Sequence, residues 1–188
     1  MHPPPLSNTL SNTPLAGTAT LRVWDPFVRV FHWSVVGACA LDLTVLDDGK
    51  LAHRWLGYGV LVLVALRLVW GVVGTRHARF IDFVPGPRTL TVYLGAMARG
   101  REPRFVGHNP AAAVMILALM ALLTTIGVTG WMQTLDAYWG VEWVEDLHEG
   151  LANLLVALVI VHVAAAVLES LRHRENLILS MITGRKRT

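Results

Sequence analysis

The 188-residue sequence predicts an all-α membrane protein: a bundle of four antiparallel transmembrane helices, with short interfacial helices on its cytoplasmic side. Hydrophobic residues make up 54% of the chain and charged residues only 15%, whereas about a quarter of the residues in soluble proteins are charged. Four apolar segments also reach the roughly 20 residues that a helix needs to cross the hydrocarbon core of a bilayer. The expected solvent of most of the chain is therefore lipid.

The four apolar segments run over residues 28–46, 53–74, 110–131 and 147–168. Residues 1–20 are rich in Pro, Ser, Asn and Thr, a composition that cannot bury a core, and we predict a disordered tail there. Residues 21–175 should form the membrane domain, and 176–188 a basic C-terminal tail or interfacial helix. Amphipathic stretches at 87–98 and 176–182 predict short helices lying on the membrane surface.

Charge in the connections predicts the orientation of the bundle, because basic residues are retained on the cytoplasmic side of a membrane. The connection 75–108 is basic, with Arg76, Arg79, Arg88, Arg99, Arg101 and Arg104 against Asp82 and Glu102. The C-terminal tail adds Arg172, Arg174, Arg185, Lys186 and Arg187. The opposite side is acidic, with Asp42, Asp47, Asp48, Asp136, Glu142, Glu145 and Asp146 against Lys50 and Arg54. Both termini are therefore predicted to face the cytoplasm.

The overall basic charge does not predict nucleic-acid binding. The net charge is +3 at pH 7, but the basic residues lie next to apolar segments and form no recognisable nucleic-acid-binding module. Anionic lipid headgroups are the expected partners of these residues.

Four of the eight histidines are predicted to lie within the membrane, at two depths. His32 lies near the cytoplasmic start of the first segment, and His162 lies toward the cytoplasmic end of the fourth. His53 and His148 begin the second and fourth segments on the periplasmic side. The other four histidines, His2, His77, His108 and His173, lie in tails or connections.

The fourth segment places a histidine near each membrane surface on one helix face. His148 and His162 are 14 residues apart, which is about 21 Å along a helix axis and within about 40° of one face. Antiparallel neighbours reverse the order of depths, so His32 can meet His162 and His53 can meet His148. This geometry predicts two planar groups, one above the other, each clamped between two imidazoles.

Paired axial imidazoles are what a b-type haem requires, and two haems b per chain are the predicted cofactors. Because two imidazoles would fill both axial positions of the iron, no position is left open for oxygen, and electron transfer is the expected function. The only cysteine is Cys39, so no C-x-x-C-H motif attaches a haem covalently. Two alternatives remain: the histidines form hydrogen bonds between helices, or they transport zinc, for which two ligands at each level would be a poor site.

Two arginines are candidate partners of haem propionates. Arg67 lies 14 residues after His53, hence on the same face but at the cytoplasmic level, where a propionate would give it a bidentate partner. The alternative is that Arg67 snorkels to lipid phosphates. Arg54, beside His53, could similarly meet a propionate of the periplasmic haem, or it could simply be solvated.

The chain resembles the bacterial cytochrome b561 family, which includes the b-type cytochrome subunits of nickel-iron hydrogenases. The resemblance runs through VWDPFVRVFHW, HRWLGYGVLVLVALRLVWGVVGTRHARF, GHNPAAAVMILALM, GVTGW, HEGLANLLVALVIVHVAAAVLES and RENLILSMITGRKR. It implies a four-helix bundle with two b haems, ligated by histidines that match His32, His53, His148 and His162.

The resemblance also makes Asp25, Pro26 and Arg29 part of a recurrent entry motif. Trp24 is expected to anchor at the membrane interface, and Arg29 to contact headgroups or a propionate. His108, just before a helix start at Pro110, is interpreted as interfacial rather than as a ligand.

The function that the resemblance implies is electron transfer between membrane quinone or quinol and a periplasmic redox partner, at the bacterial inner membrane. The partner would be a c-type cytochrome or a dehydrogenase subunit, attracted by the acidic periplasmic connections. One alternative is a stand-alone superoxide oxidase that passes electrons to quinone, with Lys50 and Arg54 as a local positive funnel. Another is a haem-braced anchor of a larger oxidoreductase. The sequence does not decide whether the chain is itself an enzyme or whether it forms a homodimer.

Overall fold

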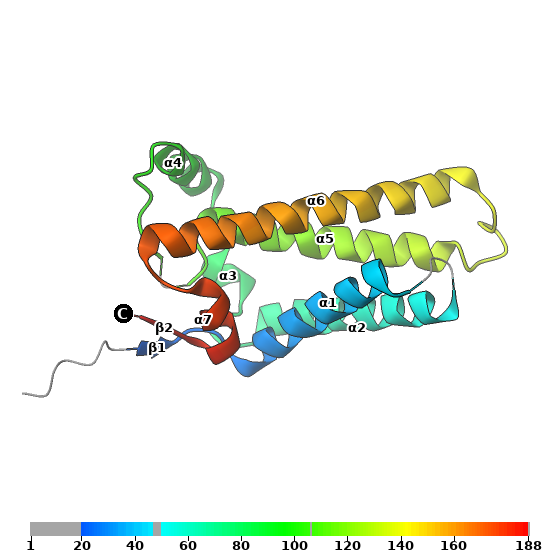
Figure 1. Cartoon of the computed structure of the whole chain (residues 1–188), viewed down its shortest axis with the longest axis horizontal. Coiled ribbons are helices and arrows are strands. Elements are labelled where there is room, and N and C mark those ends of the chain that lie inside the picture. Colours follow the sequence, from blue (N-terminus) through cyan, green and yellow to red (C-terminus); the bar gives the residue numbers. More distant parts are fainter. Residues whose placement is uncertain (1–19, 47–49, 106, 188) are drawn as a thin grey trace, which may run out of the picture.

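A computed structural model describes residues 20–46, 50–105 and 107–187 of the chain. The structure has four long helices, α1 (Pro26–Thr44), α2 (Leu51–Val73), α5 (Pro110–Met132) and α6 (Glu142–His173), and each runs antiparallel to the long helix before it (Figure 1). Each is long and apolar enough to cross a membrane. The predicted all-α membrane bundle is confirmed.

Helix α6 is longer than its apolar segment predicts. Its 32 residues span about 48 Å, more than the roughly 30 Å of the hydrocarbon core. Hydropathy detects only the part of a helix that lies in lipid, whereas backbone hydrogen bonding continues into the polar turns at 142–146 and 169–173. The predicted ligands His148 and His162 are thus carried by one continuous helix.

Capping residues fix where two of the long helices begin. Asp25 and Asn109 each precede a proline, and their side chains accept hydrogen bonds from the backbone N–H groups of Val28 and Ala112, both at 2.8 Å. Such caps satisfy donors that have no partner inside the helix, and proline is tolerated at the first helical position. The start of α1, and with it the depth of His32, is therefore set by local sequence.

The helices pack in the order α1, α2, α5, α6, with α6 resting on α5 rather than mainly on α1 or α2 within the described residues. A small core joins Val64 of α2 to Met120 and Leu123 of α5. Large apolar side chains such as Val72 and Ile160 point outward, 72% and 63% exposed. In a soluble protein such a surface would aggregate, but in a membrane lipid covers it.

The shorter elements gather at one end of the bundle, together with both ends of the described chain (Figure 1). They are α3 (Phe80–Phe83), α4 (Pro87–Ala98), α7 (Leu177–Thr183), and the strands β1 (Thr20–Arg22) and β2 (Arg185–Arg187). Helices α4 and α7 lie where short helices were predicted, but α3 and the strands were not predicted. The strands pair antiparallel, with Leu21 opposite Lys186. Of the expected N-terminal tail, only Thr20 lies within the described residues. His2, Asp47 and Asp48 lie outside them.

One expectation for the entry to α1 is wrong, and one stays a prediction. Trp24 is not an anchor at the lipid interface: it is 8% exposed, and its indole N–H donates to Ser180 Oγ at 3.3 Å. Arg29 donates to the backbone carbonyl of Ile182, at the C-terminal end of α7. A cation is favoured there because the helix dipole places negative charge at that end. Both residues therefore hold the C-terminal segment against the bundle.

Candidate functional site

The four membrane histidines form the two pairs that their depths predict. The ring centroids of His32 on α1 and His162 on α6 are 6.4 Å apart. Those of His53 on α2 and His148 on α6 are 6.1 Å apart. Helix α6 thus contributes one imidazole to each pair.

These separations fit one metal ion between two imidazoles. A metal–imidazole nitrogen bond is about 2.0–2.1 Å long, and a ring centroid lies about 1.1 Å beyond the nitrogen, so two rings on opposite sides of one ion have centroids about 6.3 Å apart. Rings that formed a direct hydrogen bond would lie closer together, and packed side chains need not be spaced this way. The geometry therefore fits the axial ligation of a haem at both levels.

Both rings of the His53 pair are oriented through Nδ1. His53 Nδ1 lies 2.8 Å from Asp42 Oδ1, and because a carboxylate only accepts, the ring must donate. His148 Nδ1 lies 3.0 Å from Thr129 Oγ1, whose single proton is directed to the backbone carbonyls of Thr125 and Ile126. His148 Nδ1–H is therefore the donor. With Nδ1 oriented in this way, Nε2 is the nitrogen that each ring would offer to a metal, and such outer partners hold ligands in place and raise their basicity.

The His32 pair is partly shielded by protein. His32 Nδ1 is buried and has no hydrogen-bond partner within the described residues, and the ring of Trp33 packs edge-on against that of His32 at 5.2 Å. A buried nitrogen without a partner is unfavourable. Such a nitrogen is expected in a ring that binds a group other than the protein's own atoms.

Glycines near the pairs leave room for a planar group. An added Cβ at Gly37, Gly57 or Gly150 would meet no other atom within 4 Å. At Gly130 it would come within 3.0 Å of His148 Cε1, so this glycine allows the close approach between α5 and the His148 ring. The donor set fits a b-type haem.

Arg67 lies buried at the level of the His32 pair and does not snorkel to the surface. Arg67 is only 2% exposed to solvent. Nη2 donates to the carbonyl of Ala78 at 3.0 Å, and the guanidinium lies 5.1 Å from the centroid of the Phe80 ring. Nη1 is buried with no hydrogen-bond partner in the described part of the chain, so Arg67 retains a donor for an anionic group. Arg54 is half-buried in the first turn of α2.

His77, His108 and His173 do not join either pair. His108 lies at the predicted end of the bundle and is half-buried against protein: its ring centroid is 4.6 Å from those of Trp24 and Phe83. Burial, with smaller contributions from nearby positive charges, lowers the pKa of His108 to about 3. It is therefore a neutral packing residue at physiological pH. No group of three metal-binding side chains forms at either histidine level within the described residues, which argues against zinc transport.

Comparison with known proteins identifies the family. The family model of the prokaryotic cytochrome b561 proteins matches residues 23–184. The chain belongs to the prokaryotic cytochrome b561 family. This confirms the resemblance, and it makes the chain a b-type cytochrome whose function is electron transfer in a membrane.

Two relatives of this cytochrome are described as probable Ni/Fe-hydrogenase B-type cytochrome subunits. The relative from Bradyrhizobium diazoefficiens is 28% identical, over 90% of this chain and 87% of its own length. The relative from Rhizobium leguminosarum bv. viciae is 29% identical, over 89% of each chain. No solved structure matches the chain.

Asp42 and Thr129 are site residues that the sequence did not reveal as such. In the sequence, Asp42 stands among the acids of the first periplasmic connection. Because a short connection joins α1 to α2, its position 11 residues before His53 could have indicated that the two side chains meet. Thr129 is one of several threonines in α5 and hydrogen-bonds its own helix like Thr124 and Thr125. Nothing local distinguishes it from them.

Proposed function

We propose that this cytochrome transfers electrons across a bacterial inner membrane through two bis-histidine b haems, one held by His32 and His162 and the other by His53 and His148. When bound, haem supplies one-electron chemistry at an iron whose axial positions are both filled. The observation that carries the proposal is the spacing of the two imidazole pairs, 6.4 and 6.1 Å between centroids.

The chain's own residues would hold and orient these groups. Asp42 and Thr129 fix the rings of His53 and His148, and Arg67 offers its buried Nη1 to a propionate of the haem at the His32 level. Arg54 is proposed to contact a propionate of the other haem. The Arg67 guanidinium is a buried hydrogen-bond donor, and an anionic partner stabilises such a cation most where the surroundings are apolar.

Charge supports an orientation with both termini in the cytoplasm. The end that carries the termini holds the arginines of the connection 75–108 and of the C-terminal segment. The opposite end exposes Asp136, Glu142, Glu145 and Asp146. The His32 pair then lies toward the cytoplasm and the His53 pair toward the periplasm.

A periplasmic redox protein is the proposed electron donor or acceptor at the acidic end. The relatives described as probable Ni/Fe-hydrogenase B-type cytochrome subunits favour a dehydrogenase subunit of the nickel-iron hydrogenase type. A c-type cytochrome with a basic surface would bind the acidic end in the same way. Opposite charge would steer such a partner to the His53 level. The same acids would repel superoxide, so they disfavour the superoxide oxidase alternative.

Quinone is the proposed partner at the other level. A groove of about 460 Å³ opens beside α1, lined by Pro26, Arg29, Val30, Trp33 and Ile182. Trp33 contacts the ring of His32, and Arg29 Nε is buried without a hydrogen-bond partner among the described residues. An apolar ring with carbonyl acceptors suits this groove.

The test is the haem-to-protein ratio of the detergent-purified protein, with reduced-minus-oxidised spectra before and after adding quinol. We expect two b haems per chain, both reduced by quinol. Trp33→Ala should retain both haems but slow their reduction. One haem per chain would refute the pairing of all four histidines, and haems that quinol does not reduce would refute the quinone-linked relay.

A further inference from the structure

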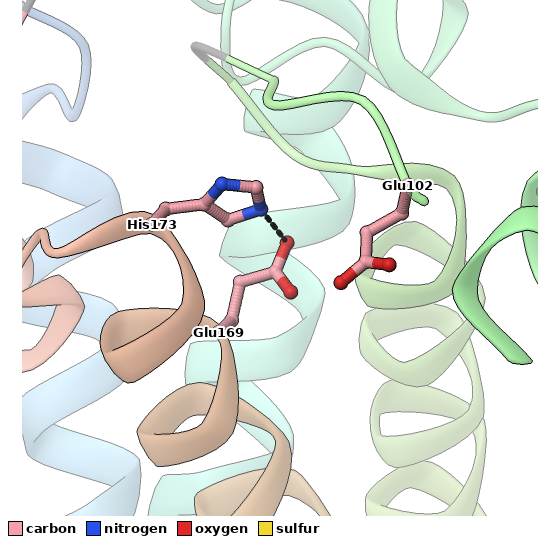
Figure 2. A group of neighbouring side chains, drawn as sticks. All are labelled: Glu102, Glu169 and His173. Atoms are coloured by element: carbon pink, nitrogen blue, oxygen red, sulfur yellow. Dashed lines mark ion pairs between the residues drawn. The ribbon is translucent and has the colours of Figure 1, made fainter. Parts of the chain in front are cut away.

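A cluster of three metal-binding side chains lies outside the proposed haem sites, at the end of the bundle that carries both termini. Figure 2 shows Glu169 and His173, from the last turns of α6, facing Glu102 of the connection between α4 and α5. One ligand atom from each side chain lies within 4.8 Å of the other two. We infer that Glu102, Glu169 and His173 bind a divalent transition-metal ion of the Zn²⁺ class.

The spacing along α6 suits chelation. Glu169 and His173 are four residues apart, so they share one helix face; a helix presents two zinc ligands in the same way in the H-E-x-x-H motif. Zinc–ligand bonds of about 2.0–2.2 Å place ligand atoms roughly 3.3–3.6 Å apart in a tetrahedral site. The Glu169 and His173 ligand atoms are already 3.4 Å apart. Rotation of the Glu102 side chain can close the remaining distance.

Two buried atoms of the cluster have no hydrogen-bond partner among the described residues, which favours a cation as their ligand. The side chain of Glu102 is 3% exposed, and its Oε2 is buried without a hydrogen-bond partner in the described part of the chain. His173 Nε2 is also buried and forms no hydrogen bond, despite lying near Glu169 Oε1. Buried polar atoms normally have partners. A metal ion would satisfy a carboxylate oxygen and an imidazole nitrogen together.

Surrounding residues hold the ligands as outer partners do in metal sites. Asn109 Nδ2 and the Tyr93 hydroxyl donate to Glu169 Oε1, at 3.0 and 3.5 Å. Arg172 donates to Glu102 Oε1 at 2.6 Å, which leaves Oε2 for a metal.

The donor set selects the class of metal. Two carboxylates and one imidazole match Zn²⁺ and similar transition ions, whereas Mg²⁺ and Ca²⁺ prefer oxygen ligands alone. The two carboxylates and Arg172 together carry one negative charge, so a divalent cation meets no repulsion. Bound there, the ion would pin the connection 99–109 to the end of α6.

The experiment measures zinc binding to the haem-loaded protein in detergent. The protein is stripped with a chelator, dialysed against ZnCl₂, and analysed for metal content; haem spectra serve as the check of folding. We expect one zinc per chain, with affinity reduced at least tenfold in both Glu102→Gln and His173→Gln. Glu175→Gln is the matched control, because this buried carboxylate pairs with Arg104 at the same end but lies outside the group.

Two results would overturn the inference: no saturable zinc binding by the wild-type protein, or equal affinity in Glu102→Gln and His173→Gln. If either variant loses its haem spectrum, thermal unfolding of the wild type decides instead. Zinc should then raise the unfolding temperature, reversibly with chelator and equally in Glu175→Gln, and an unchanged temperature would refute the site. Neither readout depends on quinone or on a periplasmic partner.

Discussion

Removing the Asp42 carboxylate should weaken one haem site and leave the other intact. Asp42 accepts a 2.8 Å hydrogen bond from His53 Nδ1, and loss of such an outer partner typically lowers metal affinity about 10–100-fold. The two side chains are 30% and 22% exposed, so water can replace part of the lost interaction. We therefore expect Asp42→Ala to lower the haem affinity of this site by the smaller amount, roughly tenfold, or about 1.4 kcal/mol.

The same change should raise the midpoint potential of that haem. A carboxylate makes the imidazole a stronger donor, which stabilises ferric iron more than ferrous iron. If the tenfold loss falls on the ferric form, the midpoint rises by about 60 mV for a one-electron couple. Spectroelectrochemical titration of the purified protein resolves the two haems as separate components, and only one should shift.

Two further variants sharpen this test. Asp42→Asn keeps an acceptor for Nδ1–H and should shift the midpoint less than Asp42→Ala. Thr129→Val removes the partner of His148 and should affect the same component. The reasoning is refuted if neither component shifts in Asp42→Ala, or if the component that shifts is the one that depends on His162.

Three other predictions concern single side chains. His162→Ala should remove the haem at the His32 level and spare the other, as judged by haem content; loss of both haems or of neither from folded protein would contradict the pairing. Arg67→Leu should lower haem retention or shift one midpoint, whereas unchanged spectra and midpoints would mean that Arg67 only holds the segment around Ala78 and Phe80. For His108, the folded-state pKa of about 3 lies below the usual 6.5. Its stabilisation is therefore complete above pH 6.5 and decreases as the pH falls toward 3. Denaturant unfolding should show about 2 kcal/mol lost between pH 7 and pH 5, a loss absent from His108→Phe and retained in His77→Gln.

The sequence was sufficient for the bundle and for the four histidines because both depend on local signals. Hydropathy marks each membrane segment, and the 3.6-residue period places His148 and His162 on one face of α6. The pairing across helices then follows from antiparallel order alone. In a membrane protein, the sequence predicts the depth of a residue as well as its helix face. The sequence of a soluble protein gives no such depth.

The sequence was insufficient where a residue's role depends on a distant partner. Trp24 and Ser180 are 156 positions apart, and the three-residue strands β1 and β2 carry no pattern of their own. Trp24 therefore read as an interfacial anchor, which is the usual role of tryptophan at that depth. The contact of Arg29 with a backbone carbonyl of α7 was hidden for the same reason, while its predicted contact with headgroups or a propionate stays a prediction.

A carboxylate contacts a histidine of the His53 pair, whereas a buried arginine lies at the level of the His32 pair, and this difference predicts the direction of electron flow. Asp42 contacts His53, and a carboxylate at this level favours the ferric form and lowers the midpoint potential. At the other level lies Arg67, a buried cation with an unused donor, which favours the ferrous form and raises it. Electrons should therefore pass from the His53 level to the His32 level, that is, from a periplasmic donor toward quinone in the proposed orientation. The component that disappears in His162→Ala should accordingly have the higher midpoint; the reverse order would mean that burial or hydrogen bonding at the irons outweighs these two charges.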